Sequence, residues 1–355
     1  MLFLSNHEKE QWDRTAGEIV RRRTPPATSP PEIRKNLESA FHFYAASRLA
    51  EDGEGELARD WLRAGALMEE DGLFLSTFLL GFLERHEGEL RKPAVAFRDP
   101  RPFLHYASIP IIVESRSRFL TQACHSLPSL PGPLRIMDIG CGDGTLTIRM
   151  IQQLLDTGKA GSLEEVLLID ASDAMVTLAE RNVGEAFPDA SVRTVHSKIQ
   201  DFSGHIRDHY DIAMSSIAFH HMPVEDKATN ISRLKPWIDH FVLFEMDGNH
   251  DTPGMGTPDL AVSVYQTYGR LIDIAYAHDA PVDVVNDCVD SFLMVELISI
   301  LTEPRGTRSD YHMLREQWME LFSDTLGPEF SIGCNSTSYS DEYLTLFTMH
   351  YGKSG

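Results

Sequence analysis

The sequence predicts an α/β fold, with a seven-stranded sheet, an all-helical N-terminal domain and a helical insertion after the fifth strand. Three observations predict this arrangement. From about residue 134 onward, short apolar runs end in polar residues and alternate with helical segments. Before about residue 95, apolar residues instead recur at helical spacing. Two long periodic segments, 259–278 and 282–301, interrupt the strands near the C-terminus.

These patterns divide the chain into three parts. We expect a helical domain over residues 1–95 and a linker with a crossing helix over 96–133. The sheet domain should follow over 134–355, with its insertion at about 258–303. Length alone allows this, since 355 residues can bury one large core or two moderate ones.

Composition restricts the partners of the protein. The chain has 32 Lys and Arg against 53 Asp and Glu, a net charge of -21. Such a surface repels phosphate backbones and anionic lipids, so we expect neither nucleic acid nor membrane as a partner. The four cysteines form no CxxC pair, and no segment is long and apolar enough to cross a membrane. We therefore expect a cytoplasmic protein.

The N-terminal helices carry one segment that needs a covering surface. Residues 73–83 are apolar almost all round, as in a helix buried in a core or between subunits. We expect a homodimer whose interface includes residues before about 95. After this region, a helix from about Pro110 to Gln122 should cross the nucleotide site. Arg116 and Arg118 on it are candidates to meet an anionic substrate, or are ordinary solvated arginines.

A glycine-rich turn follows the first strand. The run Ile136–Ile139 contains Asp138 and leads into Gly140, Gly142 and Gly144, in a GxGxG pattern. Glycines at these positions let the backbone bend tightly and approach a nucleotide. The dinucleotide pattern GxGxxG would need glycine where Thr145 stands, which argues against a nicotinamide-dependent dehydrogenase.

The second strand ends in an acidic residue. Val166–Ile169 reads as a buried strand, and Asp170 at its end is placed to accept hydrogen bonds from two ribose hydroxyls. A helix opens directly afterward, with Ser172 as its expected N-cap. Three more strands are expected over 192–196, 211–216 and 241–246, and a terminal hairpin pair after residue 331.

Motifs in this order resemble those of class I S-adenosylmethionine (SAM)-dependent methyltransferases, which have a Rossmann-like fold and begin with the pattern (D/E)xGxGxG. The resemblance covers about residues 134–250. It implies SAM as cofactor and an acidic residue that holds the ribose. It also implies a Met beside the adenine and a polar residue at its amino group, for which Asp201 fits with Gln200 as its rival. The implied SAM-binding residues are Asp138, Gly140, Gly142, Gly144, Asp170, Ala171, Met175, Gln200, Asp201 and Ser215.

Possible metal ligands follow the fifth strand, where ligands of open α/β sheets gather. His250 and Asp251 stand next to each other there, and His312 comes later on an expected helix over about 311–322. Two histidines and one carboxylate can hold Fe²⁺ or Zn²⁺ and leave positions open for substrate. His278 competes with His312 as the third ligand, and His250 could instead be a general base without metal.

His250–Asp251, His312 and the helical additions resemble a smaller group, the metal-dependent α-keto acid C-methyltransferases of natural-product biosynthesis, such as the phenylpyruvate type. That resemblance implies a chelated α-keto acid, methylated at its β-carbon, with metal ligands at His250, Asp251 and His312. The pair His220–His221 resembles a site-lining pair of many small-molecule methyltransferases. His250, His221 and Arg116 are then the catalytic candidates.

Two other readings stay open. A metal-free O- or N-methyltransferase could use His250 or His221 as its general base. The second is a catalytically inactive, methyltransferase-like regulator, although the motif residues Asp138, Gly140 and Asp170 are all present.

Overall fold

The structure, a computed structural model, describes residues 2–26, 33–69, 73–87, 90, 92 and 100–354. Seven strands form one mixed sheet in the order β3-β2-β1-β4-β5-β7-β6. All neighbours are parallel except around β7, which is antiparallel to both β5 and β6. The strands are β1 (Leu130–Ile139), β2 (Ala160–Asp170), β3 (Ser191–His196), β4 (Tyr210–Ser216), β5 (Ile238–Met246), β6 (Phe330–Ser340) and β7 (Thr345–Lys353).

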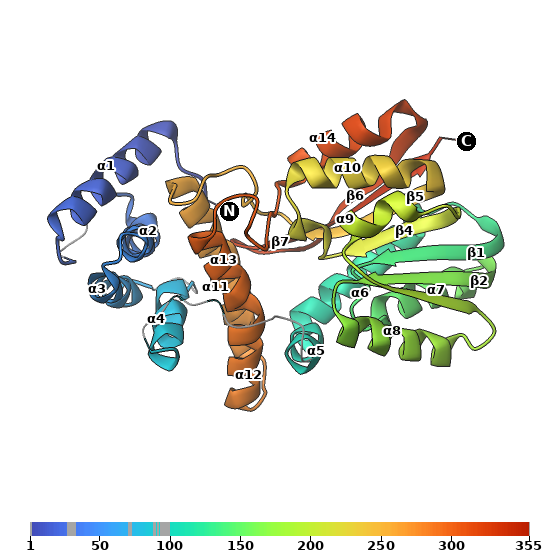
Figure 1. The fold of residues 1–355 in the computed structure, drawn as a ribbon, viewed down its shortest axis with the longest axis horizontal. Coiled ribbons are helices and arrows are strands. Elements are labelled where there is room, and N and C mark those ends of the chain that lie inside the picture. Colours follow the sequence, from blue (N-terminus) through green and yellow to red (C-terminus); the bar gives the residue numbers. More distant parts are fainter. Residues whose placement is uncertain are drawn as a thin grey trace.

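Helices cover both faces of this sheet (Figure 1). Apolar side chains such as Phe119, Met150 and Val176 pack from α6, α7 and α8 onto one face, and Ile231 and Trp318 pack from α10 and α14 onto the other. The five helices along the sheet are α6 (Pro110–Ser126), α7 (Thr145–Asp156), α8 (Asp173–Ala186), α10 (Val224–Leu234) and α14 (Arg315–Leu326). The architecture confirms the predicted seven-stranded α/β fold.

The remaining helices lie away from the sheet, where the N-terminal helices meet the insertion after β5, except α5, which lies between α12 and α6 (Figure 1). They are α1 (Asn6–Arg22), α2 (Glu38–Glu51), α3 (Gly55–Ala66), α4 (Leu75–Arg85), α5 (Pro100–Ser108), α11 (Pro258–Ala277), α12 (Val282–Cys288) and α13 (Met294–Thr302). Single turns complete the set: α9 (Ile199–Phe202), η1 (Lys35–Leu37), η2 (Ser203–His205), η3 (Phe219–His221), η4 (Lys235–Trp237) and η6 (Gly327–Glu329).

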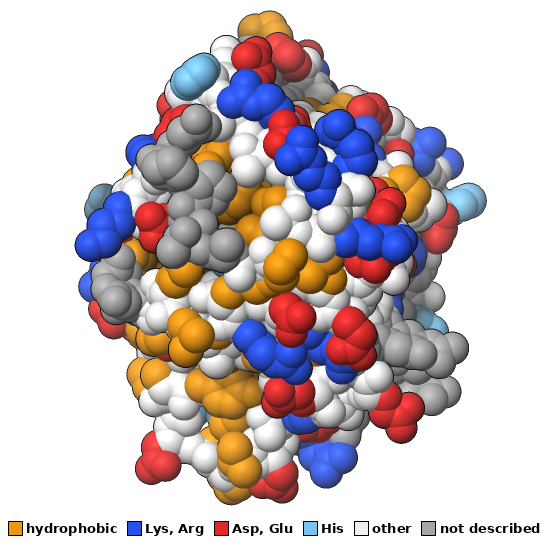
Figure 2. Space-filling model, turned by 90° about the vertical axis from the view of Figure 1, so that its left-hand side faces the viewer, with side chains coloured by type: hydrophobic (Ala, Val, Ile, Leu, Met, Phe, Trp, Pro, Cys, Tyr) orange, Lys and Arg blue, Asp and Glu red, His pale blue; other side chains and the backbone are white. Residues whose placement is uncertain are grey.

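The apolar segment over residues 73–83 is covered within its own chain. Leu75, Leu79 and Phe82 on α4 are buried, and a Cβ built at Gly269 of α11 would lie 3.3 Å from Leu75. The insertion therefore supplies the surface that this helix needs, so the homodimer stays a prediction without that motivation. Acidic and basic side chains are interspersed on this end of the molecule (Figure 2).

Two helix predictions need correction. The segment 282–301 is not one regular helix, because a π-helical turn, η5 (Val289–Leu293), lies between α12 and α13. Such turns interrupt α-helices where the backbone widens, frequently at functional sites. The helix predicted from Tyr311 instead begins at Arg315, so His312 lies in an extended segment before α14. Of the predicted linker and crossing helix over 96–133, residues 96–99 fall outside the described residues, and the rest contains α5 (Pro100–Ser108) and α6 (Pro110–Ser126), the latter at the place of the predicted crossing helix.

None of the helices in the described ranges has the length and apolar character needed to cross a lipid bilayer.

Candidate active site

The turn after β1 can be built only from glycine at its tightest point. Gly140, Gly142 and Gly144 all have positive φ, at 73°, 54° and 77°. A Cβ at Gly140 would lie 2.2 Å from the Cβ of Ala218, in the loop after β4. Gly144 is the N-cap of α7, and a Cβ there would press on α8 at Ala179 and Val183. The backbone therefore has φ angles, and approaches its neighbouring segments to distances, that residues with a Cβ cannot reach without strain.

Asp170 at the end of β2 is tied to this turn. Its carboxylate accepts hydrogen bonds from the backbone N–H groups of Gly142, at 3.0 Å, and Ser172, at 2.8 Å. Ser172 in turn caps α8, as predicted, by accepting from the N–H of Met175. Each carboxylate oxygen has a second lone pair, so Asp170 can still accept from a ligand.

Asp138 is buried beside the same turn. One of its oxygens accepts from the Thr147 hydroxyl, and the other has no hydrogen-bond partner among the described residues. Burial, together with the nearby charges of Asp170 and Asp143, raises the pKa of Asp138 to about 7. A bound cation would relieve this unfavourable burial of negative charge.

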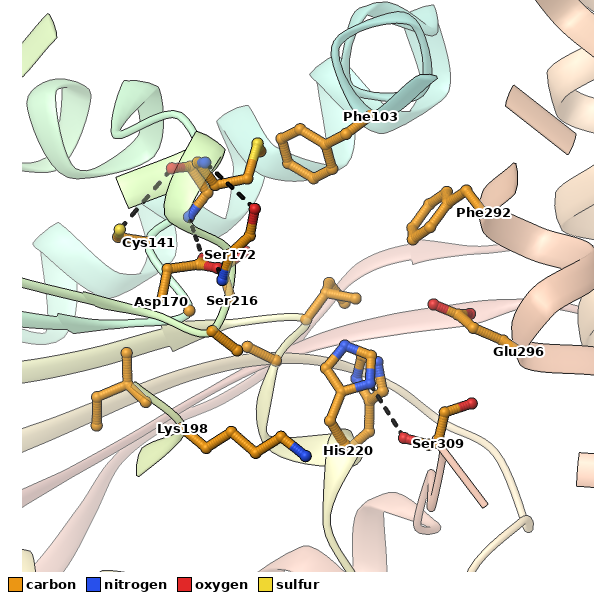
Figure 3. Close-up of a pocket in the computed structure, with 18 of the residues that line it drawn as sticks. Phe103, Cys141, Asp170, Ser172, Lys198, Ser216, His220, Phe292, Glu296 and Ser309 are labelled. Carbon is orange, nitrogen blue, oxygen red and sulfur yellow. Dashed lines mark hydrogen bonds between the residues drawn. The ribbon is translucent and has the colours of Figure 1, made fainter. Parts of the chain in front are cut away.

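One wall of a cavity of about 790 Å³ is lined by the glycine turn, Asp138 and Asp170 (Figure 3). This volume is within the usual size range of small-ligand sites. Of the other predicted SAM-binding residues, Ala171, Met175 and Gln200 also line the cavity. Asp201 does not, because its side chain is exposed, so the structure favours its rival Gln200. Ser215 is also absent from the lining, because its hydroxyl is buried in the sheet and donates to the carbonyl of Ile139.

Arg116 reaches the cavity from α6. Its guanidinium lies over the Phe103 ring, 5.6 Å from the centroid, and has no ion-pair partner within the described part of the chain. Burial lowers the pKa of Arg116. Arg118 does not line the cavity and pairs with Glu114 on the surface of the same helix. Of the two predicted arginines, Arg116 is thus the one available to an anion in the cavity.

Carboxylate and imidazole side chains lie together at the opposite wall of the cavity. His221 Nδ1 lies 3.1 Å from Asp310 Oδ1, and this carboxylate raises the pKa of His221 to about 9. Glu296 from α13 stands beside them and accepts a hydrogen bond from the Tyr268 hydroxyl at 3.1 Å. Burial and the nearby Asp310 raise the pKa of Glu296 well above its usual range. Figure 3 shows Glu296, His220 and Ser309 on the side of the cavity away from Asp170.

The predicted metal set does not assemble. The carboxylate of Asp251 is bound by the Arg305 guanidinium at 2.6 Å and by the backbone N–H of Val224 at 2.8 Å, and Lys227 Nζ lies 3.5 Å away. These partners occupy both of its oxygens, and Asp251 does not line the cavity, so the geometry gives its role as a metal ligand no support. His250 is buried outside the cavity lining, with Nε2 3.2 Å from the Thr267 hydroxyl.

The two predicted histidine ligands do lie side by side, with ring centroids 5.3 Å apart, and the Nδ1 atom of each is buried without a hydrogen-bond partner in the described ranges. Of the pair, His312 lines the cavity. The rival His278 instead stacks on His105. His250 and His312 are therefore together, but without the carboxylate that the prediction requires.

Several lining residues were not among the predicted ones: Phe103, Phe292, Glu296 and Arg308. Glu296 is separated from the glycine turn by more than 150 positions of sequence, and no local pattern marks it. Only the placement of the charged Glu296 in an otherwise apolar helix, Met294–Thr302, signals a special environment.

Comparison with known proteins gives one family match and several structures of similar fold. Residues 136–238 match a family model described as a methyltransferase domain. SCL7 of Oryza sativa has a similar structure, with 12% identity, 91% of this chain and 100% of that chain covered, and a TM-score of 0.58. At such low identity the likeness shows a shared fold alone.

Two methyltransferase structures also resemble the chain at lower scores. The plantazolicin methyltransferase BpumL has 14% identity and a TM-score of 0.44, with 77% of this chain and 100% of that chain covered. The magnesium protoporphyrin IX methyltransferase of Synechocystis PCC 6803 has 15% identity and a TM-score of 0.40, with 71% and 91% covered. No protein with a curated description matches the sequence. The family match confirms the predicted methyltransferase domain.

Proposed function

We propose that this protein transfers the methyl group of SAM to a small molecule bound in the cavity between the sheet and the helical insertion. The observation that carries the proposal is that both walls belong to one cavity. The glycine turn, Asp138 and Asp170 form one wall, and His221 and Glu296 lie on the other, with Asp310 buried next to His221. A methyl donor and an acceptor could therefore meet without crossing solvent.

The first wall suits SAM because SAM is a cation without phosphate. Asp170, already oriented by two backbone N–H groups, would accept from the ribose hydroxyls. Asp138, with one oxygen unsatisfied, would face the positively charged methionyl part. Ala171, Met175 and Gln200 would surround the adenine.

For the acceptor, we propose an α-keto acid that is methylated at its β-carbon. Arg116, which forms no ion pair with the described residues, supplies a positive charge for the carboxylate. An N–H of His221 can donate to the keto oxygen, and Glu296 is placed to accept the β-carbon proton. The β-carbon would then attack the sulfonium methyl, leaving S-adenosylhomocysteine, the methylated keto acid and a proton on Glu296.

The alternative is methylation of an oxygen or nitrogen acceptor by the same groups. In that case His221 or Glu296 would remove the proton from the heteroatom. The placement of His250 outside the cavity lining speaks against it as the base in either case.

Product analysis tests the proposal. The enzyme is incubated with SAM that carries a ¹³C-methyl group and with a panel of α-keto acids, and the products are examined by NMR. We expect the label on the β-carbon, with one S-adenosylhomocysteine formed for each label transferred. Label on oxygen or nitrogen acceptors, and none on any keto acid, would refute the α-keto acid as acceptor and support O- or N-methylation instead.

A further inference from the structure

The cavity wall opposite the glycine turn contains a ligand set that the sequence did not indicate. His220 Nε2 lies 3.5 Å and His221 Nδ1 lies 3.1 Å from the same oxygen, Asp310 Oδ1. With Glu296, these residues offer four ligand atoms that all lie within 4.8 Å of one another. We propose that His220, His221 and Asp310 bind one divalent transition-metal ion, with Glu296 beside it.

The spacing fits a common ion. Zinc binds histidine nitrogen and carboxylate oxygen at roughly 2.0–2.2 Å, so two ligands of one ion lie about 3–3.5 Å apart. The distances from Asp310 Oδ1 to His220 and His221 fall in this range. Two imidazoles and one carboxylate form a set that suits Fe²⁺ or Zn²⁺ and leaves positions open for substrate.

The surroundings of His220 are those of a metal ligand. Its Nδ1 lies 3.0 Å from Glu245 Oε2, so donation of that N–H leaves Nε2 free to bind an ion. Glu245 is itself fixed, because its Oε1 accepts the backbone N–H groups of Ala218, Phe219 and His220 at 3.1–3.3 Å. Ligand histidines are typically oriented by a carboxylate in this way.

Asp310 is fixed in the same manner. Its Oδ2 accepts from the Ser309 hydroxyl, while Oδ1 is buried and, among the described residues, makes close contacts only with His220 and His221. His221 is 36% exposed toward the cavity, so an ion held here would be reachable by an acceptor. Without an ion, a proton on His221 Nδ1 is shared between Asp310 Oδ1 at 3.1 Å and the Ser309 carbonyl at 3.2 Å. Binding of an ion must displace this proton, so the protonated cluster is the competing state.

The role of the ion, unlike its binding, rests on the proposed function. Its open positions would face the acceptor, where a carboxylate and a keto oxygen can bind one cation together. The ion would then polarise the keto oxygen in place of the His221 N–H, while Glu296 stays free to accept the proton. Asp251, the carboxylate expected from the sequence, has no part in this set.

Metal titration of the full chain, without an affinity tag, tests the site. The protein is stripped with a chelator and titrated with Zn²⁺ by calorimetry and with Co²⁺ by visible absorption. We expect one ion per chain, with the Co²⁺ absorption of nitrogen and oxygen ligands. Glu245→Gln should weaken binding roughly 10–100-fold, as loss of an orienting partner does, and Asp310→Asn at least as much.

Two control variants make the assignment specific. His209→Ala removes an exposed histidine outside the cavity lining and should leave the affinity unchanged. Asp251→Asn should leave the stoichiometry at one ion. Loss of the ion in Asp251→Asn, with retention in Asp310→Asn, would overturn the proposal in favour of the sequence-based set.

Folding of each variant is checked by circular dichroism, and if Asp310→Asn does not fold, His221→Gln at the partly exposed position takes its place. Binding no tighter in the wild type than in His221→Gln would also overturn the proposal. SAM binding is measured separately, without metal. A chain that binds one ion but no SAM would keep the metal site and refute the proposed function.

Discussion

Replacement of Gly140 by alanine should separate the cost of backbone strain from that of steric overlap in the turn that we propose binds SAM. An alanine at φ 73° costs about 1–2 kcal/mol in the left-handed region. Its Cβ would also lie 2.2 Å from the Cβ of Ala218, whereas carbon atoms in contact prefer about 3.5–4.0 Å. The turn or the loop after β4 must therefore move by more than about 1 Å.

Displacement on this scale can cost roughly 100-fold when it misplaces a reacting group. We expect Gly140→Ala to weaken SAM binding by about 100-fold, or about 2.7 kcal/mol, measured by isothermal titration calorimetry. Gly158→Ala is the matched control, because Gly158 has nearly the same φ, 68°, and nothing within 4 Å of its would-be Cβ. That variant should lose about 1–2 kcal/mol of stability and no SAM affinity.

Ala218→Gly provides the rescue. In the double variant the overlapping methyl is gone, so SAM affinity should recover to within about 10-fold of the wild type, with only the strain term left. Unchanged SAM binding in Gly140→Ala would refute the placement of the cofactor against this turn. Equal losses in Gly140→Ala and Gly158→Ala would show that global stability, and not local overlap, controls binding.

Three further outcomes follow from the geometry, and a fourth, the homodimer, follows from the sequence alone. Asp170→Ala should weaken SAM binding by roughly 10–100-fold through lost hydrogen bonds to a charged group, and an unchanged calorimetric affinity would contradict this. Because burial and the facing Asp170 and Asp143 raise the pKa of Asp138 to about 7, a cation should bind Asp138 more tightly as pH rises toward 7, where the carboxylate loses its proton. Asp138→Asn should reduce that slope, and an equal slope in both proteins would exclude Asp138 as its source. Asp251→Ala should destabilise the fold by about 3–5 kcal/mol in urea unfolding, since it leaves the buried Lys227 without its carboxylate, and a loss below about 1 kcal/mol would deny this structural role. The predicted homodimer is checked by light scattering, where a monomer mass at micromolar concentration would contradict it.

The sheet and the SAM-binding wall could be predicted because their signals are local. Buried parallel strands read as apolar runs, and each ligand-facing group stands directly after such a run. Asp170 follows this rule, Asp138 lies within the last residues of its run, and the structure places both on the cavity wall. The positive φ angles of the three glycines are a property of this turn itself and do not depend on distant parts of the chain.

The acceptor wall could not be predicted in this way because distant segments build it. Asp251 looks like a ligand beside His250, and only the fold brings Arg305 to within 2.6 Å of its carboxylate. Glu296 comes from the insertion, and Asp310 lies in an extended segment where a helix was expected. For residues of this kind, proximity is a property of the tertiary structure alone.

One calorimetric titration with SAM tests the central claim most directly. The account predicts one SAM bound per chain, displaced by S-adenosylhomocysteine, with affinity lowered in Asp170→Ala and retained in Asp189→Ala, whose side chain is exposed and outside the cavity lining. No heat of binding from SAM to the folded wild-type protein, or equal affinity in wild type and Asp170→Ala, would contradict it.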